Sequence, residues 1–388
     1  MQLTRTQLKN LRNYRYSGID QSLMSRYVLK PYWWNQLLKV IPLNMAPNLI
    51  TLTGLGFVLI NVATLVLYKY VWGVEIPRWV YYTWAVGLFL YQSFDAIDGS
   101  QARRTGTSSP LGQLFDHGVD AINTSLEALL FLHCMKSSLN LCVVAQFGCL
   151  FYFYASTWEE FHTGTLYLSY VSGPVEGILI VVAIFTVTGA KGVEFWTRQH
   201  AMPDFFGNLV LIYKPTFSYG DCLVAFLGTG LVLNVVASIA NALATVKGCC
   251  CRAFKILLGL LPYLVQWMAV GLLFIKYRSF FDQHFLIIYI LNAFIFAYTV
   301  GLVILAHVTE ARFPYWNVLM LPFVVLAADS LTFNIFTPYM TEYLFAYLGF
   351  SIGVYGNFVA HVIAMITEEF NIRCLTMGPK YPEVKKDE

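Results

Sequence analysis

Apolar stretches long enough to cross a lipid bilayer recur along most of this chain, and they limit its fold more than any other feature. The 388 residues are 57% hydrophobic and only 12% charged, with a mean hydropathy of +0.59, a composition that excludes a water-soluble globule. Because about 20 apolar residues in a helix span the hydrocarbon core, the sequence predicts an all-α, polytopic membrane protein with about ten transmembrane helices. The predicted spans are 48–70, 79–98, 112–134, 141–158, 175–190, 221–245, 255–275, 284–306, 315–334 and 343–366.

The segment before the first span has the pattern of a helix that lies flat in the membrane interface. Within residues 22–41, aromatic and aliphatic side chains such as Tyr27 and Leu37 are interspersed with Arg26 and Lys30. A helix with one apolar and one basic face binds at the headgroup boundary instead of spanning the bilayer. We therefore expect an interfacial amphipathic helix ahead of the transmembrane helices.

The distribution of charge predicts the orientation. The N-terminal arm is rich in Lys and Arg and poor in acid, so the positive-inside rule places it in the cytosol. Ten spans return the C-terminus to the cytosol, where Lys385-Lys386-Asp387-Glu388 resembles the dilysine retrieval signal of endoplasmic-reticulum membrane proteins. A solvated charged tail is the simpler alternative. A net charge of +3 without a basic stripe gives no indication of a nucleic-acid partner.

The acidic residues of this apolar chain are concentrated between Asp95 and Asp120. Asp95 and Asp98 are three positions apart near the end of one apolar segment, while Gly112, Asp116 and Asp120 recur every four residues at the start of the next. On helices, each set shares one face. Carboxylates at membrane depth are costly unless they are paired or metal-bound, and oxygen ligands suit hard divalent cations. The spacing predicts a cage for Mg²⁺ or Mn²⁺.

Such a cage is suited to phosphoryl transfer, because two metal ions held by shared carboxylates clamp a pyrophosphate and stabilise an in-line displacement at phosphorus. Arg103, one turn after Gly99, is placed to bind phosphate oxygens, and Gly99 and Gly112 leave room for a ligand against the backbone. Arg103 has an alternative role, since Arg104 beside it makes this loop basic in any case and either residue can act as a topology signal. Asp120 is placed to take a proton from an attacking hydroxyl.

These residues carry a resemblance to a known family. The aspartate series matches the signature of the CDP-alcohol phosphotransferase family at every position: Asp95-x2-Asp98-Gly99-x2-Ala102-Arg103-x8-Gly112-x3-Asp116-x3-Asp120. Further segments resemble the eukaryotic choline/ethanolamine phosphotransferases, and they lie at residues 45–51, 102–105, 110–112, 114–118, 156–160, 173–177 and 305–307. The resemblance therefore covers almost the whole chain.

The resemblance implies an enzyme that transfers phosphocholine or phosphoethanolamine from CDP-choline or CDP-ethanolamine to the sn-3 hydroxyl of diacylglycerol. The products are phosphatidylcholine or phosphatidylethanolamine and CMP, and the reaction is the last step of the Kennedy pathway. It also implies a site for two Mg²⁺ or Mn²⁺ ions and a homodimer with its interface in the C-terminal helices. The implied location is the endoplasmic-reticulum or Golgi membrane, with both termini and the active site facing the cytosol.

By motif position, the resemblance implies roles for individual residues. Asp95, Asp98 and Asp116 are the main metal ligands, and Asp120 is a further ligand or the general base. His117 competes with Asp120 for the role of base, because the ordinary pKa of an imidazole suits proton transfer, whereas metal binding lowers the basicity of a carboxylate. The expected CDP-binding residues are Gly99, Ala102, Arg103 and Gly112, together with Asn48 and Thr51 on the first helix.

A pocket for the headgroup or the acceptor is expected nearby. Asn123 and Glu127 continue the helical face of the aspartate series, and they either line this pocket or make a hydrogen bond between helices. Trp158 and Glu160 end the fourth span on the cytosolic side, and Glu176 begins the fifth. An aromatic ring beside carboxylates suits a quaternary ammonium, and an interfacial aromatic belt with solvated acids is the alternative.

We expect four regions along the chain. They are a cytosolic arm with the interfacial helix at 1–47, a catalytic helical core at 48–245, C-terminal transmembrane helices at 246–370 and a cytosolic tail at 371–388. In the basic loop near the start of the third region, Cys249, Cys250 and Cys251 form a cluster that is either S-palmitoylated or inert.

A cation transporter or channel is the rival function, since carboxylates at membrane depth also line ion paths. Transporters often carry inverted repeats with paired, interrupted apolar segments, and the sequence has no such repeat. The acids also cluster at one membrane face, together with an arginine and two glycines. This combination favours phosphate chemistry over cation passage.

Overall fold

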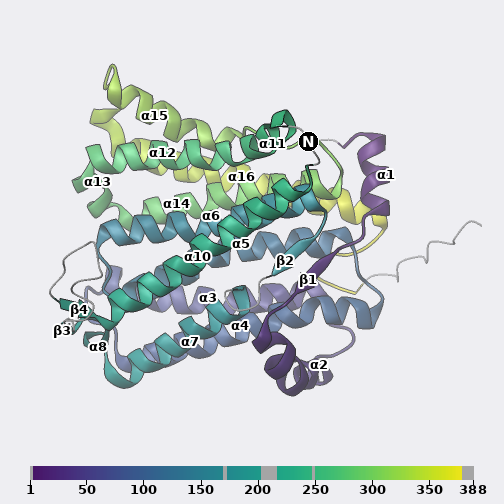
Figure 1. Cartoon of the computed structure of the whole chain (residues 1–388), viewed down its shortest axis with the longest axis horizontal. Coiled ribbons are helices and arrows are strands. Elements are labelled where there is room, and N and C mark those ends of the chain that lie inside the picture. The colour runs from purple at the N-terminus through teal and green to yellow at the C-terminus, as the bar shows by residue number, and fades with distance from the viewer. Residues whose placement is uncertain (1–2, 169–172, 202–215, 247–249, 378–388) are drawn as a thin grey trace, which may run out of the picture.

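The computed structural model describes residues 3–168, 173–201, 216–246 and 250–377, and most of them belong to helices that run side by side along the longest axis of the molecule (Figure 1). The predicted all-α class is confirmed, and each of the ten predicted apolar stretches corresponds to a helix, although α12 and α15 begin later than predicted and α4 ends later. These helices are α3 (Pro47–Leu65), α4 (Arg78–Thr105), α5 (Pro110–Cys134), α6 (Leu139–Thr163), α7 (Pro174–Lys191), α10 (Tyr219–Ala244), α12 (Leu261–Lys276), α14 (Phe285–Val308), α15 (Leu321–Leu331) and α16 (Met340–Phe370).

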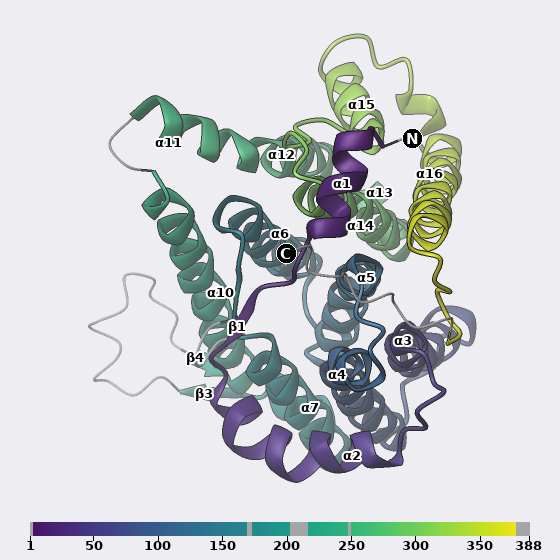
Figure 2. The same cartoon turned by 90° about the vertical axis from the view of Figure 1, so that its right-hand side faces the viewer.

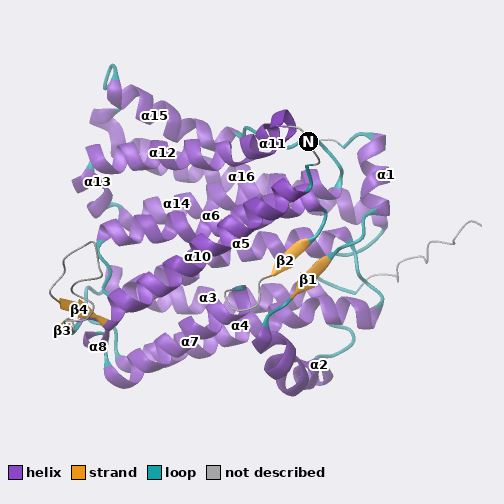
Figure 3. Ribbon diagram, in the orientation of Figure 1, coloured by secondary structure: helices purple, strands orange, loops and turns teal. Residues whose placement is uncertain are grey.

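Shorter elements extend or connect these helices. A π-helical segment, η2 (Val66–Val71), continues α3. Short helices lie between the long ones: α8 (Glu194–Thr197) follows α7, α11 (Cys250–Leu257) and η3 (Leu258–Leu260) precede α12, α13 (Arg278–Gln283) precedes α14, η4 (Val318–Met320) precedes α15, and η5 (Thr337–Tyr339) precedes α16. A small antiparallel sheet of β3 (Gln199–Ala201) and β4 (Thr216–Ser218) lies at one end of the bundle, next to α8 and the start of α10 (Figure 3).

Among the residues that the structure describes, seven helices are long and apolar enough to cross a membrane, as expected for a polytopic membrane protein. α4 and α5 are not among them, because polar and charged residues, including the four aspartates, make them less apolar on average than α3. α15 is only 11 residues long. The number of membrane crossings therefore stays a prediction.

The helices differ in how much of their apolar surface is buried inside the chain. The apolar window of α14 is 72% buried, so this helix forms the centre of its half of the bundle. The windows of α10 and α16 are only 11% and 17% buried. Because these two helices are nevertheless strongly apolar, their outer faces suit contact with lipid or with another membrane protein.

The connection between α4 and α5 brings the acidic residues to one end of the bundle. α4 stops where Gly106 adopts the left-handed conformation, with φ of 68°, that ends many helices. α5 starts at Pro110, in the first turn, where the missing N–H of proline has no intrahelical partner to lose. Asp95 and Asp98, near the end of α4, therefore lie at the same level as Asp116 and the following turns of α5.

The N-terminal arm is more elaborate than the sequence predicted. The expected helix at 22–41 is present as η1 (Ser25–Trp34), a π-helical segment, and α2 (Asn35–Val40). A further helix, α1 (Arg5–Asn13), and a strand, β1 (Gly18–Asp20), precede it. Strand β1 pairs in parallel with β2 (Leu166–Leu168), which follows α6.

Residues 14–20, which we call the N-terminal strap, cross the end of the bundle between α1 and η1 (Figure 2). At one end, Leu11 is fully buried, and Arg12 Nη2 lies 2.5 Å from Glu369 Oε1. At the other end, Ser22 Oγ donates a 2.6 Å hydrogen bond to Glu176 Oε1. Contacts of the residues before and after the strap, together with the pairing of its last three residues with β2, give the strap a defined position over the helix ends.

Two sequence predictions lie partly or wholly outside the described residues. Cys249, the first member of the proposed palmitoylation cluster, is not described, and neither are Lys385 and Lys386 of the proposed retrieval signal.

Candidate active site

A cavity of about 1300 Å³ lies at the end of the bundle where α4 ends and α5 begins. The last turns of α4, the first turns of α5 and the second half of α6 line it, together with the N-terminal strap and the segment after α16. Ten of the residues singled out from the sequence meet here. They are Asn48, Asp95, Asp98, Gly99, Ala102, Arg103, Gly112, Asp116, His117 and Asp120.

Three of the four aspartates form a compact cluster. One carboxylate oxygen from each of Asp95, Asp98 and Asp116 lies within 4.8 Å of the others. Asp95 Oδ1 and Asp116 Oδ1 are buried without a hydrogen-bond partner within the described chain, although an unpaired buried carboxylate oxygen is costly. Hard divalent cations prefer such an all-oxygen set, so the residues present fit a metal site.

Thr51 supports this cluster from α3. Its hydroxyl donates a 2.5 Å hydrogen bond to Asp98 Oδ2 and is itself buried. Thr51 was expected to bind CDP, but it does not line the cavity, and it lies behind Asp98. A hydrogen bond to a ligating carboxylate fixes the orientation of that ligand.

Asp120 stands apart from the other three aspartates. It lies one helical turn deeper than Asp116, and the Tyr91 hydroxyl from α4 donates a short hydrogen bond to Asp120 Oδ1. Asp120 is not part of the compact cluster of possible ligands. One of its two oxygens is therefore already used within the protein.

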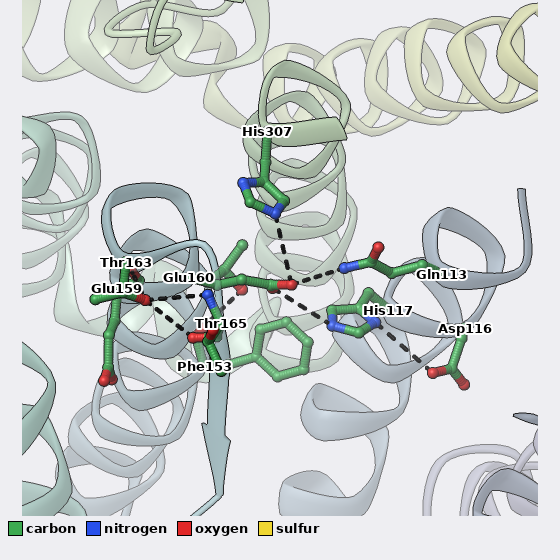
Figure 4. A network of polar contacts seen from close by, with 10 residues as sticks. Gln113, Asp116, His117, Phe153, Glu159, Glu160, Thr163, Thr165 and His307 are labelled. Carbon is green, nitrogen blue, oxygen red and sulfur yellow. Dashed lines mark hydrogen bonds and ion pairs between the residues drawn. The ribbon is translucent and has the colours of Figure 1, made fainter. Parts of the chain in front are cut away.

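His117 takes part in a polar network that joins α5, α6 and α14 (Figure 4). Its Nδ1 lies 3.7 Å from Asp116 Oδ2, and its Nε2 lies 3.8 Å from Glu160 Oε2. The other Glu160 oxygen accepts a 2.7 Å hydrogen bond from Gln113 Nε2 and lies 3.8 Å from His307 Nε2. Glu160 is only 2% exposed, so this carboxylate is held inside the protein between two imidazoles and an amide.

The neighbouring arginines Arg103 and Arg104 have different positions. Arg104 donates a 2.8 Å hydrogen bond to Ile41 O and another bond to Leu38 O, which ties the end of α4 to α2. Arg103 lines the cavity, and its Nη2 donates a 3.1 Å bond to Ser100 Oγ. Arg104 thus has a structural role that Arg103 lacks.

Gly112 leaves open space beside the cluster. No other described part of the chain lies within 4 Å of the position where a Cβ atom would stand, and this glycine lines the cavity. A ligand can therefore approach the first turn of α5 closely. Asn48 is placed at another edge of the cavity, where its Nδ2 donates to Cys374 Sγ at 3.7 Å and links α3 to the segment after α16.

The proposed headgroup residues do not line the cavity; they are Asn123, Glu127, Trp158, Glu160 and Glu176. The Trp158 side chain is fully buried, and its Nε1 donates to a backbone carbonyl at 3.1 Å. Asn123 Nδ2 donates to Glu127 Oε2 at 3.4 Å within α5. Glu176 accepts hydrogen bonds from the N-terminal arm. The Asn123–Glu127 bond lies within one helix and not between helices, and Trp158 and Glu160 are buried inside the bundle and do not form an interfacial belt with solvated acids.

Sequence reasoning missed several residues that line or adjoin the cavity. Gln113 precedes His117 by four positions, and this helical spacing was a usable signal that both face α6. Tyr14 and Tyr16 enter the cavity from the strap. Nothing in the local sequence indicated this, because their position depends on the pairing of β1 with β2, about 148 residues further along the chain.

Comparison with known proteins agrees with this geometry. A family model described as CDP-alcohol phosphatidyltransferase matches residues 44–213. An uncharacterised CDP-alcohol phosphatidyltransferase class-I family protein from Schizosaccharomyces pombe is 61% identical over 388 residues, which is 100% of both chains. The chain belongs to the CDP-alcohol phosphatidyltransferase family.

Two relatives from Saccharomyces cerevisiae in this CDP-alcohol phosphatidyltransferase family carry more specific names. Choline/ethanolaminephosphotransferase 1 is 37% identical over 385 residues, covering 95% of this chain and 96% of that protein. Cholinephosphotransferase 1 is 33% identical over 407 aligned positions, covering 98% of each. The family and the transferase class predicted from the sequence are confirmed. The matched segment 44–213 contains the aspartates, His117 and Glu160, whereas the strap and His307 lie outside it.

Proposed function

We propose that this protein transfers phosphocholine or phosphoethanolamine from CDP-choline or CDP-ethanolamine to the sn-3 hydroxyl of diacylglycerol. The hydroxyl oxygen attacks the β-phosphorus, the bond from that phosphorus to the bridging oxygen breaks, and CMP leaves. The observation that carries this proposal is the cluster of Asp95, Asp98 and Asp116 with unpaired buried oxygens, in a cavity at one end of a membrane-protein bundle. The names of the two yeast relatives support the substrate class.

Asp95, Asp98 and Asp116 would hold two divalent cations, Mg²⁺ or Mn²⁺, with Thr51 orienting Asp98. When bound, the ions neutralise the diphosphate and make the phosphorus more electrophilic. The carboxylates would hold the ions next to His117, which lines the same cavity. Arg103 binds phosphate oxygens from the α4 side, and Gly112 admits the donor against the first turn of α5.

We assign the general-base role to His117 in preference to Asp120. His117 lines the cavity and has a buried carboxylate, Glu160, 3.8 Å from Nε2 to orient the ring. Asp120 accepts the Tyr91 hydroxyl, which reduces its ability to accept a further proton. In this assignment Asp120 adds negative charge next to the three clustered aspartates. Gln113 and His307 hold Glu160 in place.

The decisive test is a transfer assay with purified protein in detergent. CDP-choline and CDP-ethanolamine are supplied in separate reactions with diacylglycerol and Mg²⁺, and both the phospholipid and CMP are measured. We expect lipid and CMP in equal amounts, and loss of both in Asp116→Ala. Asp282→Ala is the matched control, because Asp282 is an exposed residue of α13 outside the cavity. Absence of lipid from both donors, or full activity of Asp116→Ala, would exclude the proposed reaction.

We also propose that the cavity faces the cytosol from the endoplasmic-reticulum membrane and that the protein is a homodimer. The basic N-terminal arm and the cavity lie at the same end of the bundle, which agrees with the positive-inside rule. The outer face of α16 is largely uncovered, as a C-terminal dimer interface requires. Removal of an N-terminal tag by protease added outside sealed microsomes tests the orientation, and the mass of the detergent-solubilised protein tests the dimer.

A further inference from the structure

The N-terminal strap places two tyrosines on one side of an extended segment, above the cavity. Tyr14 has φ of −58° and ψ of 138°, and alternate residues of an extended chain face the same side. Tyr14 and Tyr16 both line the cavity. The backbone of the strap is held by the Arg12–Glu369 ion pair before them and by β1 after them.

Tyr14 lies beside the network around Glu160. Its ring packs edge-on against His307, with centroids 5.6 Å apart and an interplanar angle of 84°, and its hydroxyl is within hydrogen-bonding reach of Gln113. Burial and then the negative charge of Glu160 raise the pKa of the Tyr14 phenol. The ring therefore stays neutral and keeps an electron-rich face close to a buried carboxylate.

Tyr16 lies folded against the strap, because Gly18 leaves space for it. A Cβ atom at Gly18 would collide with the Tyr16 hydroxyl. Although 54% of Tyr16 is exposed, partial burial followed by the charges of Glu160 and Asp116 raises the pKa of its phenol. This second ring is thus also neutral, and it stands within the electrostatic influence of both the buried glutamate and the metal cluster.

The facing wall is aromatic as well. Tyr152 and Phe153 of α6 line the same cavity. Glu160 lies behind this lining. Its Oε1 accepts a hydrogen bond from Gln113, and His117 and His307 lie on either side of the carboxylate. A cationic group there would be attracted by the glutamate without being able to hydrogen-bond freely to it. Neutral aromatic faces with a carboxylate behind them bind a quaternary ammonium, which has no N–H to donate.

We propose that Tyr14 and Tyr16 of the N-terminal strap form the headgroup subsite and favour a trimethylammonium group over a primary ammonium group. This inference rests on the proposed function, since it takes the donor to be a CDP-aminoalcohol. In this proposal the aromatic side chains of the subsite belong to the N-terminal strap, which lies outside the residues matched by the family model. Trp158, which the sequence suggested for this role, is buried in the core.

The test compares donors that share the nucleotide and differ in the headgroup. Dissociation constants are measured for CDP-choline, CDP-ethanolamine and CMP, with Mg²⁺, on wild-type protein and on Tyr14→Leu and Tyr16→Leu. Each leucine variant is expected to weaken CDP-choline binding about tenfold and CDP-ethanolamine binding about threefold or less, since cation–π contacts are worth on the order of 1 kcal/mol. CMP binding should not change. Tyr14→Phe and Tyr16→Phe keep the ring and should retain most of the CDP-choline affinity.

Tyr32→Leu is the matched control, because Tyr32 is a highly exposed tyrosine of η1 that does not line the cavity. Equal losses for both CDP-aminoalcohols, a parallel loss for CMP, or unchanged CDP-choline affinity in both leucine variants would overturn the subsite. If the wild-type protein binds CDP-choline but forms no lipid, the proposed reaction fails, and the subsite is still judged by the binding ratios.

Discussion

His117 Nε2 lies 3.8 Å from Glu160 Oε2, across the contact between α5 and α6. Glu160 is almost fully buried, and its other oxygen is held by Gln113 at 2.7 Å. The two ring nitrogens of His117 therefore lie near two different carboxylates, those of Glu160 and Asp116. This position is the reason we propose His117, which the sequence offered as an alternative, as the general base.

Replacing Glu160 is expected to impair the chemical step more than donor binding. Glu160→Gln should lower kcat by about 10- to 100-fold, and His117→Ala should lower it by roughly 10²- to 10⁴-fold, the usual contribution of general acid–base catalysis. Initial rates at saturating donor measure both effects. Glu159→Gln is the matched control, since Glu159 is equally buried but bonds Asn241 on α10. If Glu160→Gln were as active as Glu159→Gln, the orienting role would be wrong.

Removing the Thr51 hydroxyl should weaken metal binding while leaving the fold intact. Thr51→Val keeps the shape of the side chain but deletes the hydrogen bond to Asp98. Loss of such a bond to a metal ligand commonly costs about 10- to 100-fold in affinity or activity. Titration of activity with Mg²⁺ should show a higher half-saturating concentration. Thr53→Val serves as control, because Thr53 bonds only the carbonyl of Leu49 in the same helix.

Substitutions of Arg103 and Arg104 should change different properties of the protein. Arg103→Ala is expected to raise the KM for the CDP donor about tenfold or more, since a charge-assisted contact to phosphate is lost, with little change in thermal unfolding. Arg104→Ala should instead lower the free energy of unfolding by about 1–2 kcal/mol, because it ties α4 to the carbonyls that end α2. Donor kinetics and thermal unfolding are measured for both variants. A higher KM in Arg104→Ala together with lower stability in Arg103→Ala would contradict the roles given to the two arginines.

Gly18→Ala should reproduce the loss of Tyr16 without altering the tyrosine itself. The added methyl group occupies the position of the Tyr16 hydroxyl and displaces the ring. We expect several-fold weaker binding of CDP-choline and unchanged binding of CMP, measured by calorimetry. Gly56→Ala is the control, since no other described part of the chain lies within 4 Å of its added methyl. Unaltered CDP-choline affinity in Gly18→Ala would argue that Tyr16 makes no contact with the headgroup.

The elements and residues that could be predicted are those with a local signal. A run of apolar residues predicts a helix wherever it occurs, because burying apolar side chains in lipid does not depend on distant partners. The i, i+3 and i, i+4 spacing placed Asp95 with Asp98 and Asp116 with Asp120 for the same reason. Trp158 was misplaced because a tryptophan at the end of a span has the same local pattern whether it faces a ligand or, as here, packs inside the bundle.

The sequence alone determined the membrane architecture, the carboxylate cage and the family, since each depends on short-range spacing or on composition. Only the tertiary structure decided which side chains stand around the cage. Glu160 reaches His117 through the packing of α6 against α5, and Tyr14 reaches His307 through the docking of α1 and the pairing of β1 with β2. These contacts join residues far apart in the chain, and such neighbours are selected by the packing of the whole bundle instead of by any local pattern.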